Sequence, residues 1–504
     1  MTQLETIPDV GTDTATGQPD HREVLAQRRR ERMRAAQPRG SREFTARERA
    51  EMLVDAGSFC ELSPLRTAGS SASASGVIAG WGTADGRPIV VISHDAAVAG
   101  GAIGEVFAQT VQRAQRLAID KGYPIIYIND SGGARIHDGI LALHGCGGIF
   151  SLNVEAQQRV PQISIICGPC AGAAAYSPAL TDWTIMVRGS SQMFLTGPDI
   201  VKSATGEDAS AEDIGGSHMH AVDSGVAHLE VDSESAAFDA ARQLLAFLPS
   251  YIGGSQAAVD ASGANEAAAA RLPYLVPDKS SVVFDMTELI DGVLDDRQRL
   301  TLMPDHATSV VTVLGHLDGR PVGVVANQPK SRGGILDAKA SVKAARFVEF
   351  CSRFGLPIIT FVDVPGFLPG TVEERRGVIT HGAKLLHAYI AAASPKLTVV
   401  VRKAFGGAYI AMGARSLGAD FTWAWANAEI AVMGPGGAVG LLHRRALRDA
   451  PDPAALRDEL AADYRENVAR PYLAAESGII DDVILAEETR GKLCDALAIT
   501  VANS

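Results

Sequence analysis

The chain has 504 residues, of which 46% are apolar and 21% charged, so it can bury an ample core in two to four domains. Its net charge of −12 disfavours binding to nucleic acid. No apolar run reaches membrane-spanning length, and the polar residues 1–9 do not resemble a signal peptide. Six scattered cysteines are typical of reduced thiols. We therefore expect an enzyme of the cytoplasm that makes no use of membranes or nucleic acid.

The amino-terminal part alternates between polar and helical patterns. Residues 1–20 lack apolar periodicity and are predicted to be disordered. The basic run at residues 28–34 indicates a solvated helix face, or alternatively a phosphate contact to an extended ligand. Thr45 and Glu48 have the spacing of a capping box, which predicts a helix through Val54.

The rest of the chain alternates between apolar strands and amphipathic helices, which predicts an α/β fold with a parallel sheet covered on both faces. In the first half, strands are expected near residues 77–81, 88–93, 125–128 and 163–167, and a helix at residues 104–120. A stretch rich in Gly, Ser and Ala at residues 254–272 is predicted to be a linker. It divides an N-terminal domain at residues 21–253 from a C-terminal domain at residues 273–504.

The second half repeats the first. The segment Gly86-Arg87-Pro88 matches Gly319-Arg320-Pro321, and Gly122-Tyr123-Pro124 matches Gly355-Leu356-Pro357, both at an offset of 233. Pro161 matches Pro395 at 234, Gly172-Ala173 matches Gly407-Ala408 at 235, and Gly197-Pro198 matches Gly434-Pro435 at 237. An offset that stays almost constant over five ordered anchors indicates duplication of one domain.

Each half carries one glycine turn at the end of a buried strand, at Gly172-Ala173 and at Gly407-Ala408. Such turns leave backbone N–H groups free, and free N–H groups stabilise oxyanions that develop during a reaction. Two turns suit a reaction with two developing oxyanions. The alternative is that the glycines only allow close packing between helix and strand.

Several other motifs suggest different chemistry. Cys167 and Cys170 form a C-x-x-C pair, a candidate for redox chemistry, and Gly168-x-Cys170-x-Gly172 resembles a nucleophile elbow with a cysteine nucleophile. The repeat disfavours a thiol function, because the residues of the second half that correspond to Cys170, at offsets of 234 and 235, are Ala404 and Phe405, which have no thiol. His218 and His220 lack further ligands nearby, and we expect no metal site.

Longer motifs around these turns resemble those of acyl-CoA carboxylase β subunits, of the propionyl-CoA carboxylase type, from about residue 22 to the C-terminus. The resemblance is carried by DSGGARI at 130–136, GPCAG at 168–172, YSPALTD at 176–182, FLTGPD at 194–199, VANQP at 325–329, FVDVPGFLPGT at 361–371 and RKAFGGAY at 402–409.

The resemblance implies two duplicated crotonase-like domains and a carboxyltransferase reaction. Carboxybiotin, carried on a separate biotin carboxylase/biotin carrier α subunit, loses CO₂; the ureido anion takes the α-proton of an acyl-CoA, and the enolate attacks the CO₂. By motif, Gly172 and Ala173 would hold the thioester oxygen, and Gly407 and Ala408 the ureido oxygen. The expected residues that bind the acyl-CoA or biotin are Gly132, Gly133, Ala134, Arg135, Tyr409, Gly434 and Gly436. Family proteins form homohexamers, as trimers of dimers, with each site between two chains.

Three positions depart from the family pattern: Ala173 where Gly is common, Thr110 where Lys is frequent, and Pro435 in a stretch of small residues. The resemblance further implies that Ile410 helps to select the acyl chain, with propionyl-CoA as a good substrate and acetyl- and butyryl-CoA as further candidates. The alternative is that Ile410 is an ordinary core isoleucine. A decarboxylase acting in the reverse direction and a non-catalytic structural subunit also stay open as functions.

Overall fold

The computed structural model describes residues 20–34, 42–65, 75–255, 259–279 and 282–501. The disorder predicted for residues 1–20 therefore falls, apart from residue 20, outside the described residues. The basic run lies in helix α1 (His21–Arg34), but the side chains of residues 29–34 are also outside the described set.

The first half of the chain forms a mixed sheet with the strand order β1-β2-β3-β4-β5-β6-β8, to which β7 is added beside β5. The antiparallel strands β1, β2 and β3 lie at one end, and the other neighbours are parallel. The bounds are β1 Cys60–Glu61, β2 Val77–Ala84, β3 Arg87–His94, β4 Ile125–Ser131, β5 Gln162–Ala171, β6 Trp183–Val187, β7 Gln192–Phe194 and β8 Leu229–Val231.

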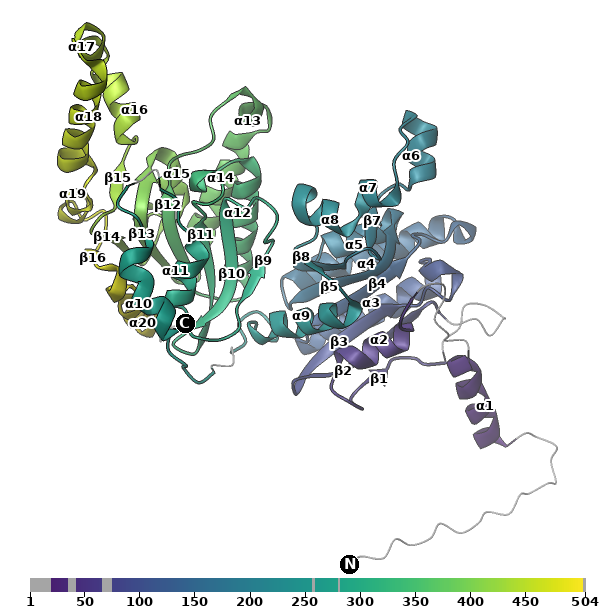
Figure 1. Cartoon of the computed structure of the whole chain (residues 1–504). Helices are drawn as coiled ribbons and strands as arrows, with labels where there is room; N and C mark the ends of the chain where they lie inside the picture. The colour runs from purple at the N-terminus through teal and green to yellow at the C-terminus, as the bar shows by residue number, and fades with distance from the viewer. Residues whose placement is uncertain (1–19, 35–41, 66–74, 256–258, 280–281, 502–504) are drawn as a thin grey trace, which may run out of the picture.

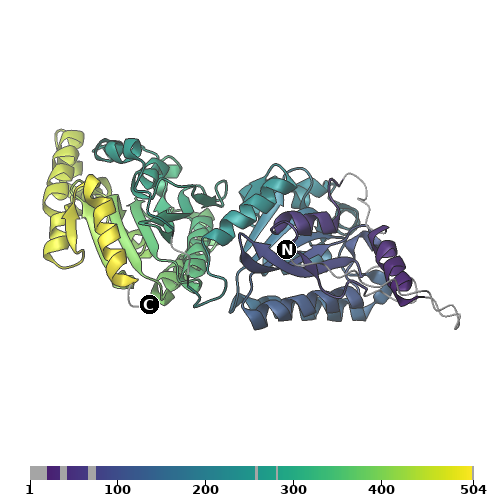
Figure 2. The same cartoon turned by 90° about the horizontal axis from the view of Figure 1, so that it is seen from below.

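The second half builds the same sheet again, in the order β9-β10-β11-β12-β13-β14-β16 with β15 beside β13. Its strands are β9 Leu300–Leu302, β10 Val310–Leu317, β11 Arg320–Asn327, β12 Ile358–Val364, β13 Lys396–Phe405, β14 Phe421–Trp425, β15 Glu429–Ala431 and β16 Asp482–Ile484. The predicted α/β class and the predicted duplication are confirmed: two like sheets lie side by side (Figures 1 and 2).

Helices cover the sheets because their apolar residues recur with the helical period. In α3 (Glu105–Lys121), Phe107, Val111, Ala114 and Ala118 are buried on one face. The helix ends at Gly122, which has φ +70° and takes the left-handed conformation that favours glycine. The capping box predicted at Thr45 and Glu48 is present at the start of α2.

The remaining long helices of the first half are α2 Ala46–Leu53, α4 Ile140–Gln157, α6 Pro198–Thr205 and α9 Glu234–Ala246, with the short helices α5 Tyr176–Ala179, α7 Ala211–Gly215 and α8 Ser217–Met219. The long helices of the second half are α11 Met286–Val293, α12 Ala338–Arg353, α14 Val378–Ala391, α16 Pro435–Leu442, α18 Pro453–Tyr464 and α20 Thr489–Thr500. Its short helices are α13 Thr371–Arg375, α15 Gly406–Ala411, α17 Arg444–Asp449 and α19 Pro471–Glu476.

The segment between the halves is partly helical. Helix α10 (Glu266–Leu275) begins inside the stretch expected to be a linker, and its Leu272 is buried against the core of the second half. The halves also contact each other directly, since the rings of Trp183 and Phe350 lie 4.8 Å apart, edge to face. Within the described residues, no helix has both the length and the apolar character needed to cross a membrane.

Candidate active site at two glycine turns

The first glycine turn follows strand β5. Gly172 has φ +59°, in the left-handed region, and opens a 3₁₀ turn (Gly172–Ala175) that continues into α5. A Cβ atom on Gly172 would meet no atom closer than the Leu195 carbonyl oxygen at 3.9 Å, so glycine is required here by its backbone conformation, not by lack of space. The first N–H groups of a helical turn have no partner within the turn, so Ala173 offers a donor at the end of the strand.

The second glycine turn follows β13 in the same way. Gly406 has φ +60° and is the first residue of α15, while Phe405 is its N-cap. The next residue, Gly407, has open space around its Cβ position and a backbone conformation that any residue can adopt. The N–H groups in the first turn of α15 are again donors without an intrahelical partner.

The strands correct the register that was read from the sequence. Both β5 and β13 have ten residues, and their ends Ala171 and Phe405 are 234 apart. The left-handed Gly172 therefore matches Gly406, and Ala173 matches Gly407. The offset of 235 that pairs Gly172-Ala173 with Gly407-Ala408 is wrong by one residue, because it aligned letters and not backbone conformation.

The second turn lies beside an apolar pocket of about 520 Å³. Gly407, Tyr409 and Ile410 line it together, whereas Ala408 is fully buried. The Ile410 side chain is 42% exposed, which excludes an ordinary core position. Burial raises the pKa of Tyr409 to about 12, so this phenol stays neutral, and its hydroxyl has no hydrogen-bond partner among the described residues.

Gly434 and Gly436 lie at the start of α16 and do not line this pocket. A Cβ atom on Gly434 would lie 3.1 Å from the Phe405 ring, whereas Gly436 has open space around it. Gly434 therefore lets α16 approach the end of β13 closely, next to the second turn.

The loop after β4 lies against the first turn. Gly133 has φ +100°, and a Cβ atom there would be 2.8 Å from the Ala171 carbonyl oxygen. Gly132 donates its N–H to the Gly100 carbonyl at 3.0 Å, and Ala134 is bridged to Ile103. This part of the loop therefore reaches the end of β5.

Arg135 points to a different pocket, of about 460 Å³, formed with the segment around Gly104 and Phe107. Its guanidinium lies 3.7 Å from the Asp138 carboxylate and is partly exposed. The structure thus brings Gly133 to the first turn, places Gly132 and Ala134 against the segment at Gly100 and Ile103, and leaves Arg135 beside a neighbouring pocket.

The cysteine motifs do not form a reactive site. Cys167 and Cys170 are free thiols at 2% and 0% exposure, and burial raises the pKa of Cys170 to about 12 and that of Cys167 further. A thiol acts as a nucleophile or redox centre through its exposed thiolate. Both the redox and the cysteine-hydrolase alternatives are therefore disfavoured.

The histidines also have ordinary structural roles. His220 is buried and its Nε2 lies 2.6 Å from the Met193 carbonyl oxygen, while His218 is exposed near Glu230. Within the described residues, no group of three or more His, Cys, Asp or Glu side chains could hold a metal ion.

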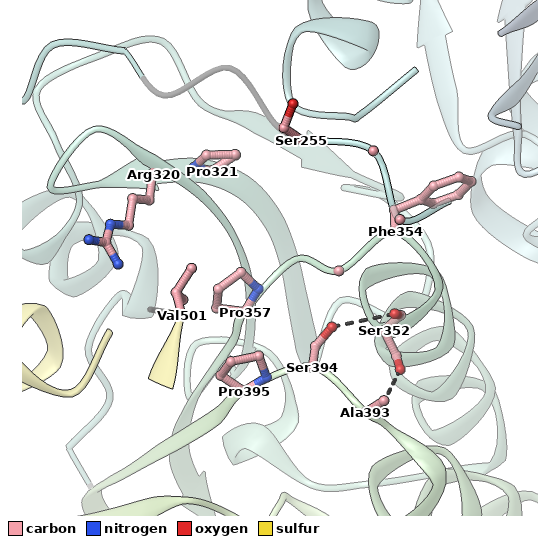
Figure 3. A pocket seen from close by; sticks show the side chains of 13 residues that line it. Ser255, Arg320, Pro321, Ser352, Phe354, Pro357, Ala393, Ser394, Pro395 and Val501 are labelled. Atoms are coloured by element: carbon pink, nitrogen blue, oxygen red, sulfur yellow. Dashed lines mark hydrogen bonds between the residues drawn. The ribbon is translucent and has the colours of Figure 1, made fainter. Parts of the chain in front are cut away.

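A further pocket, of about 560 Å³, lies at the end of the second sheet where its parallel strands begin, away from the glycine turn. Figure 3 shows Pro321, Pro357 and Pro395 in its wall, and these residues stand at the amino ends of β11, β12 and β13. Ligands of parallel sheets bind beyond the carboxyl ends of the strands. We therefore do not assign this pocket to the active site.

Sequence reasoning missed the charged residues beneath the turns. Asp130 in β4 and Asp363 in β12 are buried at equivalent positions, 233 residues apart. Asp130 binds Arg49, from a distant segment, whereas Asp363 binds Arg402 in the neighbouring strand. The equal spacing of the two aspartates could have revealed them; the identity of the arginine that pairs with Asp130 could not be read from it.

Comparisons with known proteins agree with these features. The model of the carboxyl transferase domain family matches residues 36–504. A propionyl-CoA carboxylase carboxyltransferase subunit from Haloferax mediterranei is 48% identical over 89% of each chain. The propionyl-CoA carboxylase beta chain of Saccharopolyspora erythraea is 46% identical over 90% of this chain and 87% of its own.

Two further relatives widen the picture. The methylmalonyl-CoA decarboxylase subunit alpha of Veillonella parvula is 44% identical, covering 91% of this chain and 90% of its own. A crystal structure of transcarboxylase 12S, described as a hexamer with methylmalonyl-coenzyme A bound, superposes with a TM-score of 0.90 at 41% identity over 95% of each chain. These similarities confirm the crotonase-like carboxyltransferase fold, and this chain belongs to the carboxyl transferase domain family.

Proposed function

We propose that this chain is the carboxyltransferase subunit of a biotin-dependent acyl-CoA carboxylase. It moves the carboxyl group from carboxybiotin on a partner protein to the α-carbon of a short-chain acyl-CoA, with propionyl-CoA a good substrate. One observation carries the proposal: two turns of the same conformation, Gly172 at φ +59° and Gly406 at φ +60°, end equivalent strands. A reaction that develops two oxyanions needs two such sets of donors.

The first turn serves the acyl thioester. The N–H groups of Gly172 and Ala173 donate to the thioester oxygen, which becomes negative as the α-proton leaves. This interaction is stronger in the transition state than in the ground state, so it lowers the barrier to enolate formation. The loop with Gly132 and Gly133 adjoins this turn and forms part of the acyl-CoA site.

The second turn serves the biotin. We assign the N–H groups at Gly407 and Ala408 as donors to the ureido oxygen, one position further along the turn than the donor pair of the first turn. The apolar pocket lined by Tyr409 and Ile410 suits an uncharged bicyclic ring. Carboxybiotin supplies the carboxyl group and, once that is released, a base for the α-proton. Because biotin itself takes the proton, the mechanism requires no side-chain base at either turn. Ile410, as an apolar wall, tolerates several short acyl chains.

Each active site combines the first turn of one chain with the second turn of another. Within one chain the two turns lie in separate halves, and α6 and α16 beside them project from the upper side of Figure 1. Apolar side chains are exposed around both turns: Ile136, Ile140, Leu141, Leu195 and Ile200 in the first half, and Ile410, Val432, Met433, Leu441 and Leu442 in the second. Apolar patches of this kind mark protein interfaces. We infer that the assembly is a homohexamer, a trimer of dimers; the related transcarboxylase 12S is described as a hexamer.

The test is an assay of the purified chain with a biotin carboxylase and biotin carrier subunit, ATP and bicarbonate, against acetyl-, propionyl- and butyryl-CoA. We expect carboxylation that requires every component, with propionyl-CoA among the better substrates. ATP-dependent carboxylation of an acyl-CoA from bicarbonate by this chain without any biotin-bearing partner would contradict the proposal. Because one relative is named as a decarboxylase subunit, release of CO₂ from methylmalonyl-CoA with no forward carboxylation would favour that direction.

A further inference from the structure

Each glycine turn is preceded by an irregularity in the sheet. Strands β12 and β13 pair regularly up to Val362 and Val400, and pairing resumes at Val364 and Ala404. One residue of β12, Asp363, therefore lies opposite three residues of β13. Within this bulge β13 also changes its other neighbour: it pairs with β14 up to Val400 and with β15 from Lys403, and this second pairing continues to Phe405, the residue before Gly406.

The Asp363 carboxylate holds the bulge in place. It is fully buried and accepts the backbone N–H of Lys403 at 2.9 Å. Its other oxygen accepts Nη2 of Arg402 at 2.8 Å, and the Arg402 side chain is only 2% exposed. Both partners of the carboxylate are thus residues of the bulge itself, four and three positions before the second turn.

Arg402 also fastens the bulge to the segment that precedes α11. Its Nη1 donates to the carbonyl oxygen of Val282 at 2.8 Å, and its guanidinium lies 5.0 Å from the centre of the Phe284 ring. The planar guanidinium makes these contacts and the carboxylate contact at once, which a lysine ammonium cannot do.

The first half has the same bulge with a different clamp. Pairing between β4 and β5 shifts after Asn129 and Ile166 and resumes at Ser131 and Cys170, with Asp130 in between. Gly168 stands where the second half has Arg402, and a Cβ atom there would lie 2.4 Å from Asp130 Oδ1.

The partners of Asp130 come from outside the bulge. The Arg49 guanidinium, itself 1% exposed, reaches Asp130 at 3.0 Å and also binds Glu234. Arg42 binds the same carboxylate. Pro169, at the position of Lys403, has no N–H to donate.

We infer that Arg402 is a positioning residue for the second turn, and that Arg49 plays this part for the first. Arg402 acts through Asp363 and the bulge of β13: it fixes the direction in which the strand delivers the N–H groups at Gly407 and Ala408. The inference rests on the proposed function, because it expects substitution of each arginine to weaken binding of the ligand that the proposed function assigns to that turn. Arg402 governs the biotin side, and Arg49 governs the acyl-CoA side.

The test uses carboxyl transfer from methylmalonyl-CoA to free biotin by the full chain. In this step the bond between the α-carbon and the carboxyl carbon breaks, the carboxyl group bonds to the ureido nitrogen, and the proton of that nitrogen moves to the α-carbon. The KM values for free biotin and for methylmalonyl-CoA are measured separately for Arg402→Lys and Arg49→Lys. These two variants are a matched pair, because each keeps the positive charge and removes the planar set of N–H donors of the guanidinium.

For Arg402→Lys we expect kcat/KM for biotin to fall by about 10- to 100-fold, since a misplacement of about 1 Å costs up to 10²-fold. The KM for methylmalonyl-CoA should stay within about twofold, because the first turn is untouched. Arg49→Lys should give the opposite pattern. Melting temperature and oligomer size are recorded for both variants. If Arg402→Lys fails to fold, Asp363→Asn replaces it, because asparagine keeps an acceptor for Lys403; if Arg49→Lys fails to fold, Asp130→Asn replaces it, because Asp130 is the carboxylate that Arg49 binds.

Equal losses for both ligands in both variants, or no loss in either, would overturn the inference, since a general structural role moves both parameters together. Gly407→Pro separates this from failure of the proposed function. If Gly407→Pro leaves transfer to biotin unchanged, the second turn does not serve biotin. If Gly407→Pro abolishes transfer while Arg402→Lys has no effect, only the positioning inference fails.

Discussion

The two halves of the chain share a backbone and differ in what surrounds it. Both have a left-handed glycine at the end of a ten-residue strand, a bulge before it and a buried aspartate beside the bulge. Around these features the side chains diverge. At the offset of 234, Gly168 of the first half corresponds to Arg402 of the second, Cys170 to Ala404, and Tyr176 to Ile410. The shared part is what a pair of N–H donors requires; under the proposed function, the divergent part serves two different ligands.

The largest expected effect comes from removing a donor. In Ala173→Pro and Gly407→Pro, one N–H is lost at matched positions, and proline fits the first turn of a helix, where no helical bond is broken. Each change should lower kcat by about 10²–10³-fold, the usual cost of losing an oxyanion donor. Turnover is measured in the reconstituted carboxylase, with folding checked by circular dichroism.

Gly407→Ala is the control for this pair, because it keeps the N–H and adds a methyl group where the structure has open space. It also reproduces the residue that the first half already has, Ala173. A loss much smaller than that of Gly407→Pro is expected. Equal losses from both changes would mean that the site is sensitive to bulk and not to the donor.

A smaller effect is expected at Ile410, which lines the pocket of the second turn. Ile410→Asp places a carboxylate on an apolar wall and should change the ratio of kcat/KM between acetyl-, propionyl- and butyryl-CoA by about tenfold, since one methylene is worth about 1–3 kcal/mol in such a pocket. The three substrates are compared in parallel assays. A uniform fall in all three rates would show that Ile410 packs without selecting.

The next smaller effect is a dependence of the free energy of unfolding on pH, which comes from a histidine that only the first half has at this position. Burial lowers the pKa of His94 to about 4, and the equivalent residue of the second half is Asn327, which does not titrate. Between pH 6.5 and 4 the unfolded chain binds a proton at this histidine and the native chain does not. Stability is therefore lost as pH falls through this window, by up to about 1.4 kcal/mol per pH unit.

The variant His94→Asn should remove this contribution. Urea midpoints of the variant and the wild type are compared at pH 7, 6, 5 and 4.5. As pH falls, the urea midpoint of the wild type should decrease more than that of His94→Asn. A difference that is independent of pH would mean that His94 does not resist protonation in the native chain.

The smallest effect is expected at Cys170. Because Ala404 stands at this position in the second half, Cys170→Ala makes the two strands more alike. Activity should stay within a few fold, since the thiol is buried and protonated. Carboxyl transfer is assayed beside thioester hydrolysis, and complete loss of activity would restore the hydrolase hypothesis.

Patterns in the sequence were enough to predict the fold class, the duplication and the two turns. Apolar strands and glycines at fixed spacing carry this information, because they follow from local backbone requirements. The register at the second turn was missed by one residue: Gly406 and Gly407 are the same letter, and only the backbone angle distinguishes them. The clamp of Arg49 on Asp130 was also beyond prediction, since it joins residues 81 positions apart. Whether Ile410 is buried could not be predicted either, because isoleucine has the same pattern in a core and in a pocket.

The central claim is that two matched turns move a carboxyl group between an acyl-CoA and biotin. It is tested most directly by incubating the purified chain with methylmalonyl-CoA carrying a labelled carboxyl group and with free biotin. The account predicts that labelled carboxybiotin and propionyl-CoA form in equal amounts, without ATP and without any other protein. Hydrolysis of the thioester to free CoA, with no label on biotin, would contradict it.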